Sequence, residues 1–327
     1  WTTAQIEQAI DTLGAIVKEG IQVAWDNAVE SGAALDEDLD ISILFDQLAY
    51  TYSTTAQSNT NVPDKEWVYG NATNFKTQYG TAEVWNQSPF EVSRTLADMP
   101  AGTYTITTKA FFRNAANIPN LENYDPSAEP EAAVFAGHAK TPLTNVAELA
   151  QDAFEGWGEV NLSDGTKKYV PNNQKNAYDL FEDEAYTEQL QKSVTTVLTE
   201  PGDLKFGVKA SEMAGDSWVV WYTFSIAYNA VDKDALSAEL KTFAEEVRDF
   251  LETNIYVMNA LAAQQLGDAA GNAESALDKD VEAMSAAYAA LQTAYDYAKA
   301  NIEIMAKYVA ADENLALVAE EYYEQAS

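Results

Sequence analysis

The residues that could perform chemistry are acidic and aromatic, because the chain of 327 residues has no Cys and a single His, His138. Thiol nucleophiles, disulfide scaffolds, Cys-ligated zinc sites and His-dependent triads are therefore excluded. His138 follows a glycine in an expected loop or strand end, and no companion group can be named for it. Paired carboxylates could hydrolyse glycosides, but no motif singles out a pair among the 52 acidic residues. We therefore expect a protein that is not an enzyme.

Sugar binding is the chemistry that the remaining side chains fit best. Such a site needs aromatic rings against the apolar faces of a pyranose and a few polar groups that orient its hydroxyls. Trp157 is the foremost candidate, since Gly156 and Gly158 flank it in a loop where an exposed ring is expected. The further candidate ligand-binding residues are Trp85, Trp221, Arg113, Tyr69 and Tyr169.

Three of these candidates have a competing structural explanation. Trp85 occupies the centre of an expected strand, where packing in the core is slightly favoured over ligand contact. Trp221 alternates out of the predicted buried face of its strand, so it is expected to be exposed or covered by a helix. Arg113 shares a strand face with Phe111, and in so acidic a protein a salt bridge is favoured over a ligand contact.

The charge of the chain limits its partners. Asp and Glu number 52 against 19 Lys and Arg, which gives a net charge of −33. Such a chain repels phosphate backbones and anionic membrane surfaces, so neither nucleic acid nor an anionic membrane surface is an expected partner. A solvated surface is the favoured explanation of this charge, ahead of cation binding or adaptation to salt. The chain has no run of about 18 apolar residues, so no membrane span is expected.

No cofactor is predicted, and structural calcium is the one ion that the acidic residues leave open. The acidic run 36–40 lacks the ligand spacing of an EF-hand, so a solvated linker is favoured there. The chain begins at Trp1 without a signal peptide, which suggests a processed or excised piece of a longer precursor.

The elements that must position these residues predict an α+β chain of several domains. Residues 1–35 form an N-terminal helix, in which Thr2 and Gln5 fit a capping box. Residues 36–230 alternate with a period of two between turn signals, which indicates an antiparallel β-sandwich of the jelly-roll type. Residues 231–327 return to a helical period and predict a helical bundle. The expected strands are 41–45, 66–70, 82–86, 90–96, 103–113, 132–136, 193–199, 204–210 and 218–228.

Two strands and three insertions define the sandwich further. Strand 103–113 turns Tyr104, Ile106, Ala110 and Phe112 to one face. Strand 218–228 is predicted to bury one face throughout, formed by Trp218, Val220, Tyr222, Phe224, Ile226 and Tyr228. Residues 117–131 carry three prolines and predict a long surface loop, while 143–155 and 174–188 predict short helices.

The C-terminal segment predicts long helices. An apolar stripe at 236–255 is followed by a predicted break at 267–272, where two glycines occur. A second helix starts near Asp278 and carries a heptad seam from Val281 to Val309, with an expected interruption at 312–314. The N-terminal helix has an apolar stripe and no helical neighbour in sequence, so we expect it to pack with these helices.

Several motifs resemble a jelly-roll module that is common in surface and secreted proteins of Bacteroidota. They comprise Glu83-Val84-Trp85, Leu96-Ala97-Asp98-Met99-Pro100-Ala101-Gly102-Thr103-Tyr104 and Phe111-Phe112-Arg113, and the resemblance extends over about residues 40–230. These modules are similar to galactose-binding-like carbohydrate-binding domains. The last motif departs from the family, since Trp221-Tyr222-Thr223-Phe224 lacks the usual Asp-Asn pair, and the role of that pair does not carry over.

The resemblance implies a non-catalytic, extracellular or cell-surface module that binds a glycan. The alternative hypothesis is a structural subunit that self-associates through its helices into a surface layer or filament. The heptad seam and the unpartnered N-terminal helix favour this alternative, and the segment 231–327 loosely resembles three-helix repeats of bacterial surface proteins. A second alternative is an accessory region of a glycoside hydrolase.

Overall fold

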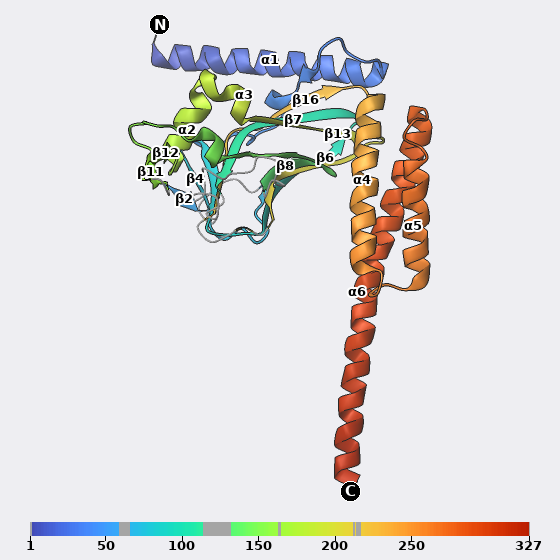
Figure 1. Cartoon of the computed structure of the whole chain (residues 1–327). Coiled ribbons are helices and arrows are strands. Elements are labelled where there is room, and N and C mark those ends of the chain that lie inside the picture. The colour runs from blue at the N-terminus through green and yellow to red at the C-terminus, as the bar shows by residue number, and fades with distance from the viewer. Residues whose placement is uncertain are drawn as a thin grey trace. The chain divides into compact units, whose positions relative to one another are not determined.

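A computed structural model describes residues 2–58, 66–113, 132–162, 165–211, 213 and 217–326, with side chains described as far as residue 311. The chain divides into two compact units, Trp1–Asp232 and Lys233–Ser327. Figure 1 colours the elements by their order in the chain. The predicted loop 117–131 lies outside the described residues.

The first unit begins with the long helix α1 (Thr3–Ser31). The predicted capping box is confirmed, because the Thr2 hydroxyl accepts from the Gln5 N–H and Gln5 Oε1 accepts from the Thr2 N–H. Gly32 ends the helix in the left-handed region, with φ of 59°. Near this end Trp25 and Ala28 are buried in the core of the sandwich. The predicted packing of the helix with the C-terminal helices stays a prediction.

Two sheets form an antiparallel sandwich, which confirms the predicted fold class. Among the described residues, the first sheet has the order β1-β16-β7-β15-β5-β4-β2, with β10 and β13 also paired to β7. Its strands are β1 (Leu39–Asp40), β2 (Gln57–Ser58), β4 (Phe75–Gln78), β5 (Thr81–Trp85), β7 (Gly102–Arg113), β10 (Thr144–Asn145), β13 (Gln191–Leu198), β15 (Trp218–Trp221) and β16 (Ser225–Asn229). The second sheet comprises β3 (Trp67–Val68), β6 (Phe90–Met99), β14 (Gly202–Ala210), β8 (Ala132–Ala136) and β9 (Ala139–Pro142), in that order.

The core lies between these sheets. In β7 the alternation has the predicted effect, because Tyr104, Ile106, Ala110 and Phe112 all belong to the buried core. The predicted strand 41–45 is wrong, since residues Ser42–Leu44 form a 3-10 turn, η1, after the short strand β1.

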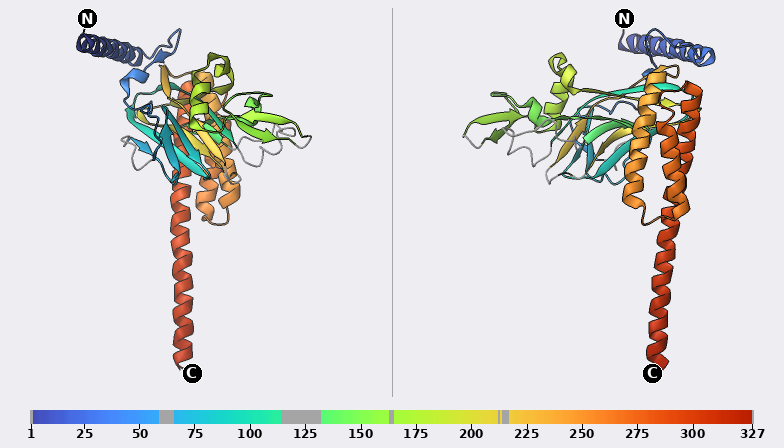
Figure 2. Two further views of the ribbon diagram at one scale, coloured as in Figure 1. Left: turned by 90° about the vertical axis from the view of Figure 1, so that its left-hand side faces the viewer. Right: turned by 45° about the vertical axis from the view of Figure 1, so that its right-hand side comes forward.

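A second, smaller core covers the outer face of the first sheet. Its side chains come from β7, β15 and the segment between β9 and β13. This segment contains η3 (Val146–Leu149), the hairpin of β11 (Gly158–Asn161) and β12 (Lys167–Val170), α2 (Gln174–Glu182), η4 (Glu184–Tyr186) and α3 (Thr187–Leu190). Figure 2 shows the hairpin extending away from the sandwich. The helix predicted at 143–155 is wrong apart from the single turn η3, because β10 precedes it and irregular chain follows.

The predicted single strand 218–228 is two strands, of which β15 is buried on both faces and β16 on one. Trp218 and Val220 of β15 point into the second core, whereas Phe224, Ile226 and Tyr228 point into the sandwich. The break between β15 and β16 changes the phase of the alternation, so the prediction of one continuous buried face is wrong.

The second unit consists of α4 (Lys233–Asn254), α5 (Ala260–Glu274) and α6 (Val281–Ala326). The predicted break at 267–272 is wrong, because α5 runs through both glycines and begins at Ala260, after the capping side chain of Asn259. A Cβ atom at Gly267 would lie 3.6 Å from the Leu251 side chain, so this part of α5 packs against α4. The interruption expected at 312–314 is also wrong, since α6 continues through it.

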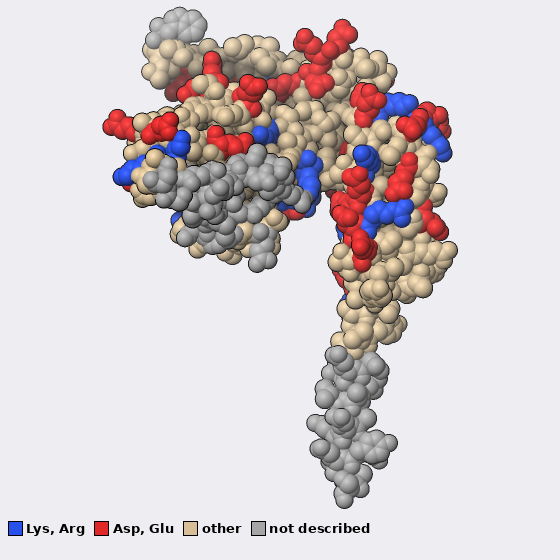
Figure 3. Space-filling model, in the orientation of Figure 1, with Lys and Arg blue, Asp and Glu red and all other residues tan. Residues whose placement is uncertain are grey.

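The seam of α6 is buried only along its first half. Met284, Leu291, Tyr295 and Ala298 are buried where α4 and α5 pack against α6, and Val309 is exposed beyond them (Figure 1). Among the described residues, no helix is both long and apolar enough to cross a membrane. Acidic side chains are spread over the face of the molecule seen in Figure 3, with fewer basic ones between them.

Candidate functional site

The side chains that could bind a ligand lie on the outer face of the first sheet, where β5, β15 and β7 are neighbours. In β5, Val84 points into the sandwich core, so Glu83 and Trp85 point to the outer face. The register pairs Trp218 with Trp85 on one side and with Arg113 on the other. These three side chains therefore form a row across three strands, although they are far apart in sequence.

Helix α2 determines which part of this face is open. It packs over the Thr81 end of β5, where Gln174 Nε2 donates to the Thr81 hydroxyl at 3.2 Å and both residues are buried. Trp85, four residues along the strand, is 44% exposed. A pocket of about 230 Å³ lies in this region. It is lined by Gln78, Glu83, Trp85, Arg113, Asn172, Asn173, Gln174 and Trp218.

Glu83 supplies the pocket with a carboxylate. Its Oε2 accepts a hydrogen bond from Trp218 Nε1 at 2.7 Å, and Lys76 lies opposite it in β4. Burial raises the pKa of Glu83, while the hydrogen bond from Trp218 and the charges of Lys76 and Arg113 act in the opposite direction. A carboxylate has about four acceptor positions, so one fixed by Trp218 can still accept hydrogen bonds from a ligand.

Arg113 supplies a fixed cation on the other side of Trp218. Its Nη1 donates to Asn172 Oδ1 at 2.5 Å, and its guanidinium carbon lies 5.6 Å from the centre of the Trp218 ring. That distance is within the range of a cation–π interaction. The salt bridge predicted for Arg113 stays a prediction.

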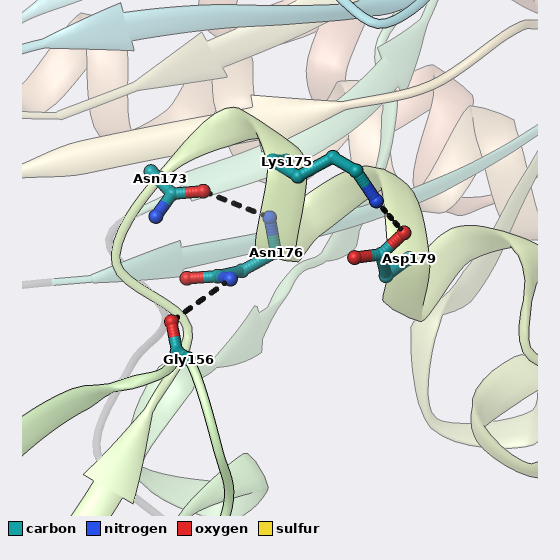
Figure 4. A network of polar contacts seen from close by, with 5 residues as sticks. All are labelled: Gly156, Asn173, Lys175, Asn176 and Asp179. Carbon is teal, nitrogen blue, oxygen red and sulfur yellow. Dashed lines mark hydrogen bonds and ion pairs between the residues drawn. The ribbon is translucent and has the colours of Figure 1, made fainter.

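Hydrogen bonds hold the start of α2 at the edge of the pocket. Asn173 caps the helix, because its Oδ1 accepts from the Asn176 N–H at 2.9 Å. The Asn176 amide in turn donates to the carbonyl of Gly156 at 3.2 Å, which ties α2 to the loop before β11. Lys175 and Asp179 form an ion pair on the next turn of the helix (Figure 4).

The structure brings Trp85 and Arg113 together in the pocket lining. It also shows that the expected packing of Trp85 in the core is wrong. Core packing was the favoured explanation for Trp85, but its ring is half-exposed on the outer face. The reason is the parity of β5, which places Val84 in the sandwich and so directs Trp85 away from it.

The expected exposure of Trp157 is wrong. Its side chain is 8% exposed, and its ring stacks on Phe154 with centroids 4.1 Å apart. Gly156, with φ of 88°, turns the chain here, and at Gly158 a Cβ atom would lie 2.8 Å from Asn172. The glycines around Trp157 thus permit close packing of the loop, and the ring belongs to the second core.

The remaining predicted residues also lie outside the pocket lining. Trp221 is fully buried inside the sandwich, so the expectation that it is exposed or covered by a helix is wrong. Tyr69 is partly buried at the edge of the same core, with its ring 4.6 Å from that of Phe75. Tyr169 lies in the hairpin strand β12.

Sequence reasoning missed several residues of the pocket, among them Glu83, Trp218 and Asn172. The alternation of side chains along β5 could have identified Glu83, because residues 83 and 85 lie on the same face of the strand. Trp218 was assigned to a buried face, and only its pairing with Trp85 and Arg113 shows its place in the row. Among the described residues, no group of three or more His, Cys, Asp and Glu could hold a metal ion. Structural calcium stays a prediction.

No protein-family model and no curated protein matches the chain. A structure of the CBM51-2 and INT domains of Clostridium perfringens ZmpB in complex with GlcNAc is 11% identical, with a TM-score of 0.21. The alignment covers 80% of this chain and 46% of that one, so this chain matches about half the length of that structure.

Two further solved structures are similar over half of this chain. A structure described as "CBM4 structure and function" is 10% identical, with a TM-score of 0.24, and the match covers 50% of this chain and 86% of that one. TmCBM61 in complex with β-1,4-galactotriose is 12% identical, with a TM-score of 0.20, over 53% of this chain and 86% of that one.

Proposed function

We propose that the first unit is a non-catalytic glycan-binding module whose site is the pocket beside Trp85. The observation that carries the proposal is the half-exposed Trp85 ring in one row with Trp218 and Arg113, next to the carboxylate of Glu83. An aromatic face with a few fixed polar groups is the composition that a sugar-binding site requires.

Each group in the pocket has a distinct role in this proposal. The Trp85 ring receives the apolar face of a pyranose, while Glu83 accepts hydrogen bonds from its hydroxyls. Arg113 and the amide of Asn172 donate hydrogen bonds, and their mutual contact fixes their orientation before the sugar binds. The pocket volume of about 230 Å³ is below the roughly 300–1,000 Å³ of drug-sized ligand sites, which favours a single sugar ring within it.

The proposal places the module outside the cell or at its surface, in a Bacteroidota protein, as the sequence resemblance implies. An accessory region of a glycoside hydrolase would use the same site in the same way. Both versions share the non-catalytic role of the pocket, so the binding experiment below tests them together.

Calorimetric titration of the full chain tests this function. The probes are glucose, galactose and N-acetylglucosamine, each also as its β-1,4-linked trisaccharide. We expect at least one monosaccharide and its trisaccharide to bind, and we expect Trp85→Ala to remove the binding of both. Tyr256→Ala is the matched control, because Tyr256 is an aromatic residue of the second unit that is 95% exposed. Unchanged binding by Trp85→Ala would contradict the site, and no binding of any probe would contradict the function.

The second candidate function is self-association through α1, as a subunit of a surface layer or filament. The observation that favours it is an exposed apolar stripe on α1, formed by Ile6, Ile10, Leu13 and Ile16. Contiguous exposed apolar surface of this kind is typical of interaction sites. Sedimentation velocity should show wild-type oligomers that Leu13→Ser weakens and Tyr256→Ser leaves intact. A monomeric wild-type chain at high concentration would contradict this candidate.

A further inference from the structure

We propose that three tyrosines beside the pocket, Tyr52, Tyr79 and Tyr178, form a second platform for a sugar ring, so that the site takes an extended oligosaccharide chain. This inference rests on the proposed function of the Trp85 pocket. It adds the class of ligand, because one monosaccharide cannot contact the tyrosines and Trp85 together.

The three rings form a single cluster. The centroid of the Tyr52 ring lies 5.8 Å from that of Tyr79 and 5.6 Å from that of Tyr178. The centroids of the Tyr79 and Tyr178 rings lie 6.3 Å apart. Lys175 lies over two of the rings, with its Nζ 5.5 Å from the centre of Tyr178 and 6.0 Å from that of Tyr79. Its ion pair with Asp179 holds the ammonium group in that position (Figure 4).

The cluster adjoins two residues of the pocket lining. Gln78 and Gln174 line the pocket, and the next residue after each, Tyr79 and Lys175, belongs to the cluster or lies against it. Gln78 pairs with Thr81, and the four residues from Thr81 to Trp85 extend about 13 Å along β5, so Gln78 and Trp85 lie at opposite ends of this strand. An extended glycan could span this length.

Tyr52 is held in place although its side chain is exposed. Tyr52 is 56% exposed, but the loop that carries it is attached to the end of β4. The Ser53 carbonyl accepts from the Tyr79 N–H at 2.7 Å, and the Thr54 carbonyl accepts from Gln78 Nε2 at 2.7 Å. A ring fixed before binding loses little conformational entropy when a ligand stacks on it, which is the property that a binding platform needs.

The chemistry of the cluster suits a sugar. Among the described residues, the hydroxyls of Tyr52, Tyr79 and Tyr178 make no hydrogen bond within the chain, so they can bond to sugar hydroxyls. The exposed ring of Tyr52 offers an apolar face, and the ammonium group of Lys175 is a nearby donor. Aromatic faces beside fixed polar groups are thus present at both ends of the site.

The test compares monosaccharides with their β-1,4-linked trisaccharides in calorimetric titrations of the full chain. We expect a trisaccharide to bind more tightly than its monosaccharide, and Tyr52→Ala to weaken the trisaccharide about tenfold, or about 1.4 kcal/mol. The same variant should leave the monosaccharide affinity unchanged. Tyr52→Phe retains the ring and should lose less, and Tyr256→Ala controls for loss of an exposed aromatic residue. Because Tyr52 is exposed, its variants should unfold at the wild-type temperature.

The possible results separate this inference from the proposed function. Equal affinities for a monosaccharide and its trisaccharide, both unaffected by Tyr52→Ala, would overturn the extended site and leave the Trp85 pocket standing. Equal weakening of both probes by Tyr52→Ala would also overturn it, because the ring would then act through the pocket. If none of the probes binds to the wild-type chain, the proposed function and this inference are both wrong.

Discussion

Trp221 provides a quantitative test of the sandwich core, because sequence reasoning assigned it to a ligand site and the structure buries it completely. Its ring packs 5.9 Å from Phe75 and stacks 6.5 Å from Phe90, and its Nε1 donates to the Tyr50 hydroxyl at 3.0 Å. Trp221→Ala should lower the free energy of unfolding by about 3–5 kcal/mol, since it leaves a cavity. Trp221→Phe should cost about 2 kcal/mol, from a smaller cavity and the lost hydrogen bond.

Tryptophan fluorescence makes this measurement specific to the first unit. All 7 tryptophans lie within residues 1–221, so their fluorescence reports unfolding of the first unit, while far-ultraviolet circular dichroism reports mainly the helices. For a unit of this size, about 1 kcal/mol shifts the melting temperature by roughly 2–4 °C. The Trp221→Ala variant should therefore melt about 6–20 °C below the wild type.

Trp85→Ala is the matched control for Trp221. Fully burying a large apolar side chain contributes about 1.5–3 kcal/mol, so the half-exposed Trp85 should contribute roughly 1 kcal/mol. The two substitutions should thus differ several-fold in their effect on stability. Equal melting temperatures for Trp85→Ala and Trp221→Ala would refute the assignment of Trp221 to the core.

Three further predictions concern other parts of the chain. Leu291→Ala should destabilise the second unit by about 2–5 kcal/mol, because Leu291 is fully buried in the α6 seam. The fluorescence transition should not change, since the tryptophans lie in the first unit. An unchanged melting curve of the helices by circular dichroism would contradict the burial of Leu291. Because burial raises the pKa of Glu83, the proton it binds in the folded state stabilises the fold at low pH, and this contribution is lost as the pH rises through that pKa. Wild-type stability relative to Glu83→Gln should therefore increase on acidification towards pH 4.5, the ordinary pKa of the group, and a pH-independent difference would oppose this. The chain carries a net charge of −33, so its melting temperature should rise with NaCl, because salt screens the repulsion between acidic side chains over a Debye length of about 10 Å at 0.1 M. An extra rise with millimolar calcium would indicate a specific calcium site. A melting temperature that does not change with salt would contradict this prediction.

Local patterns predicted the elements whose environment is set by their own sequence. The alternation of β7 gave its core face, and Thr2 with Gln5 gave the start of α1. Both signals lie within a dozen residues. The glycines at 267 and 271 suggested a break, but both lie inside α5, where the helix packs against α4. A loop between two glycines likewise suggested an exposed Trp157, although distant residues bury it.

The candidate site depends on contacts that no local pattern contains. Trp85 and Arg113 were both named from sequence, but Trp218 joins them through the registers of two strand pairs. The strand β15 is buried on both faces because the segment between β9 and β13 folds over the outer one. A period of two in sequence cannot distinguish a strand with one buried face from a strand with two, so the site required the three-dimensional structure.

The indole N–H signals of the tryptophans test the central claim most directly. In a ¹⁵N-correlated NMR spectrum of the full chain, Trp85 and Trp218 are expected to shift on titration with a binding β-1,4-linked trisaccharide, since both line the pocket. Trp221 and Trp157 should stay in place, because they are buried in the two cores. Shifts confined to Trp157 or Trp221, with Trp85 and Trp218 unchanged, would contradict the proposed site.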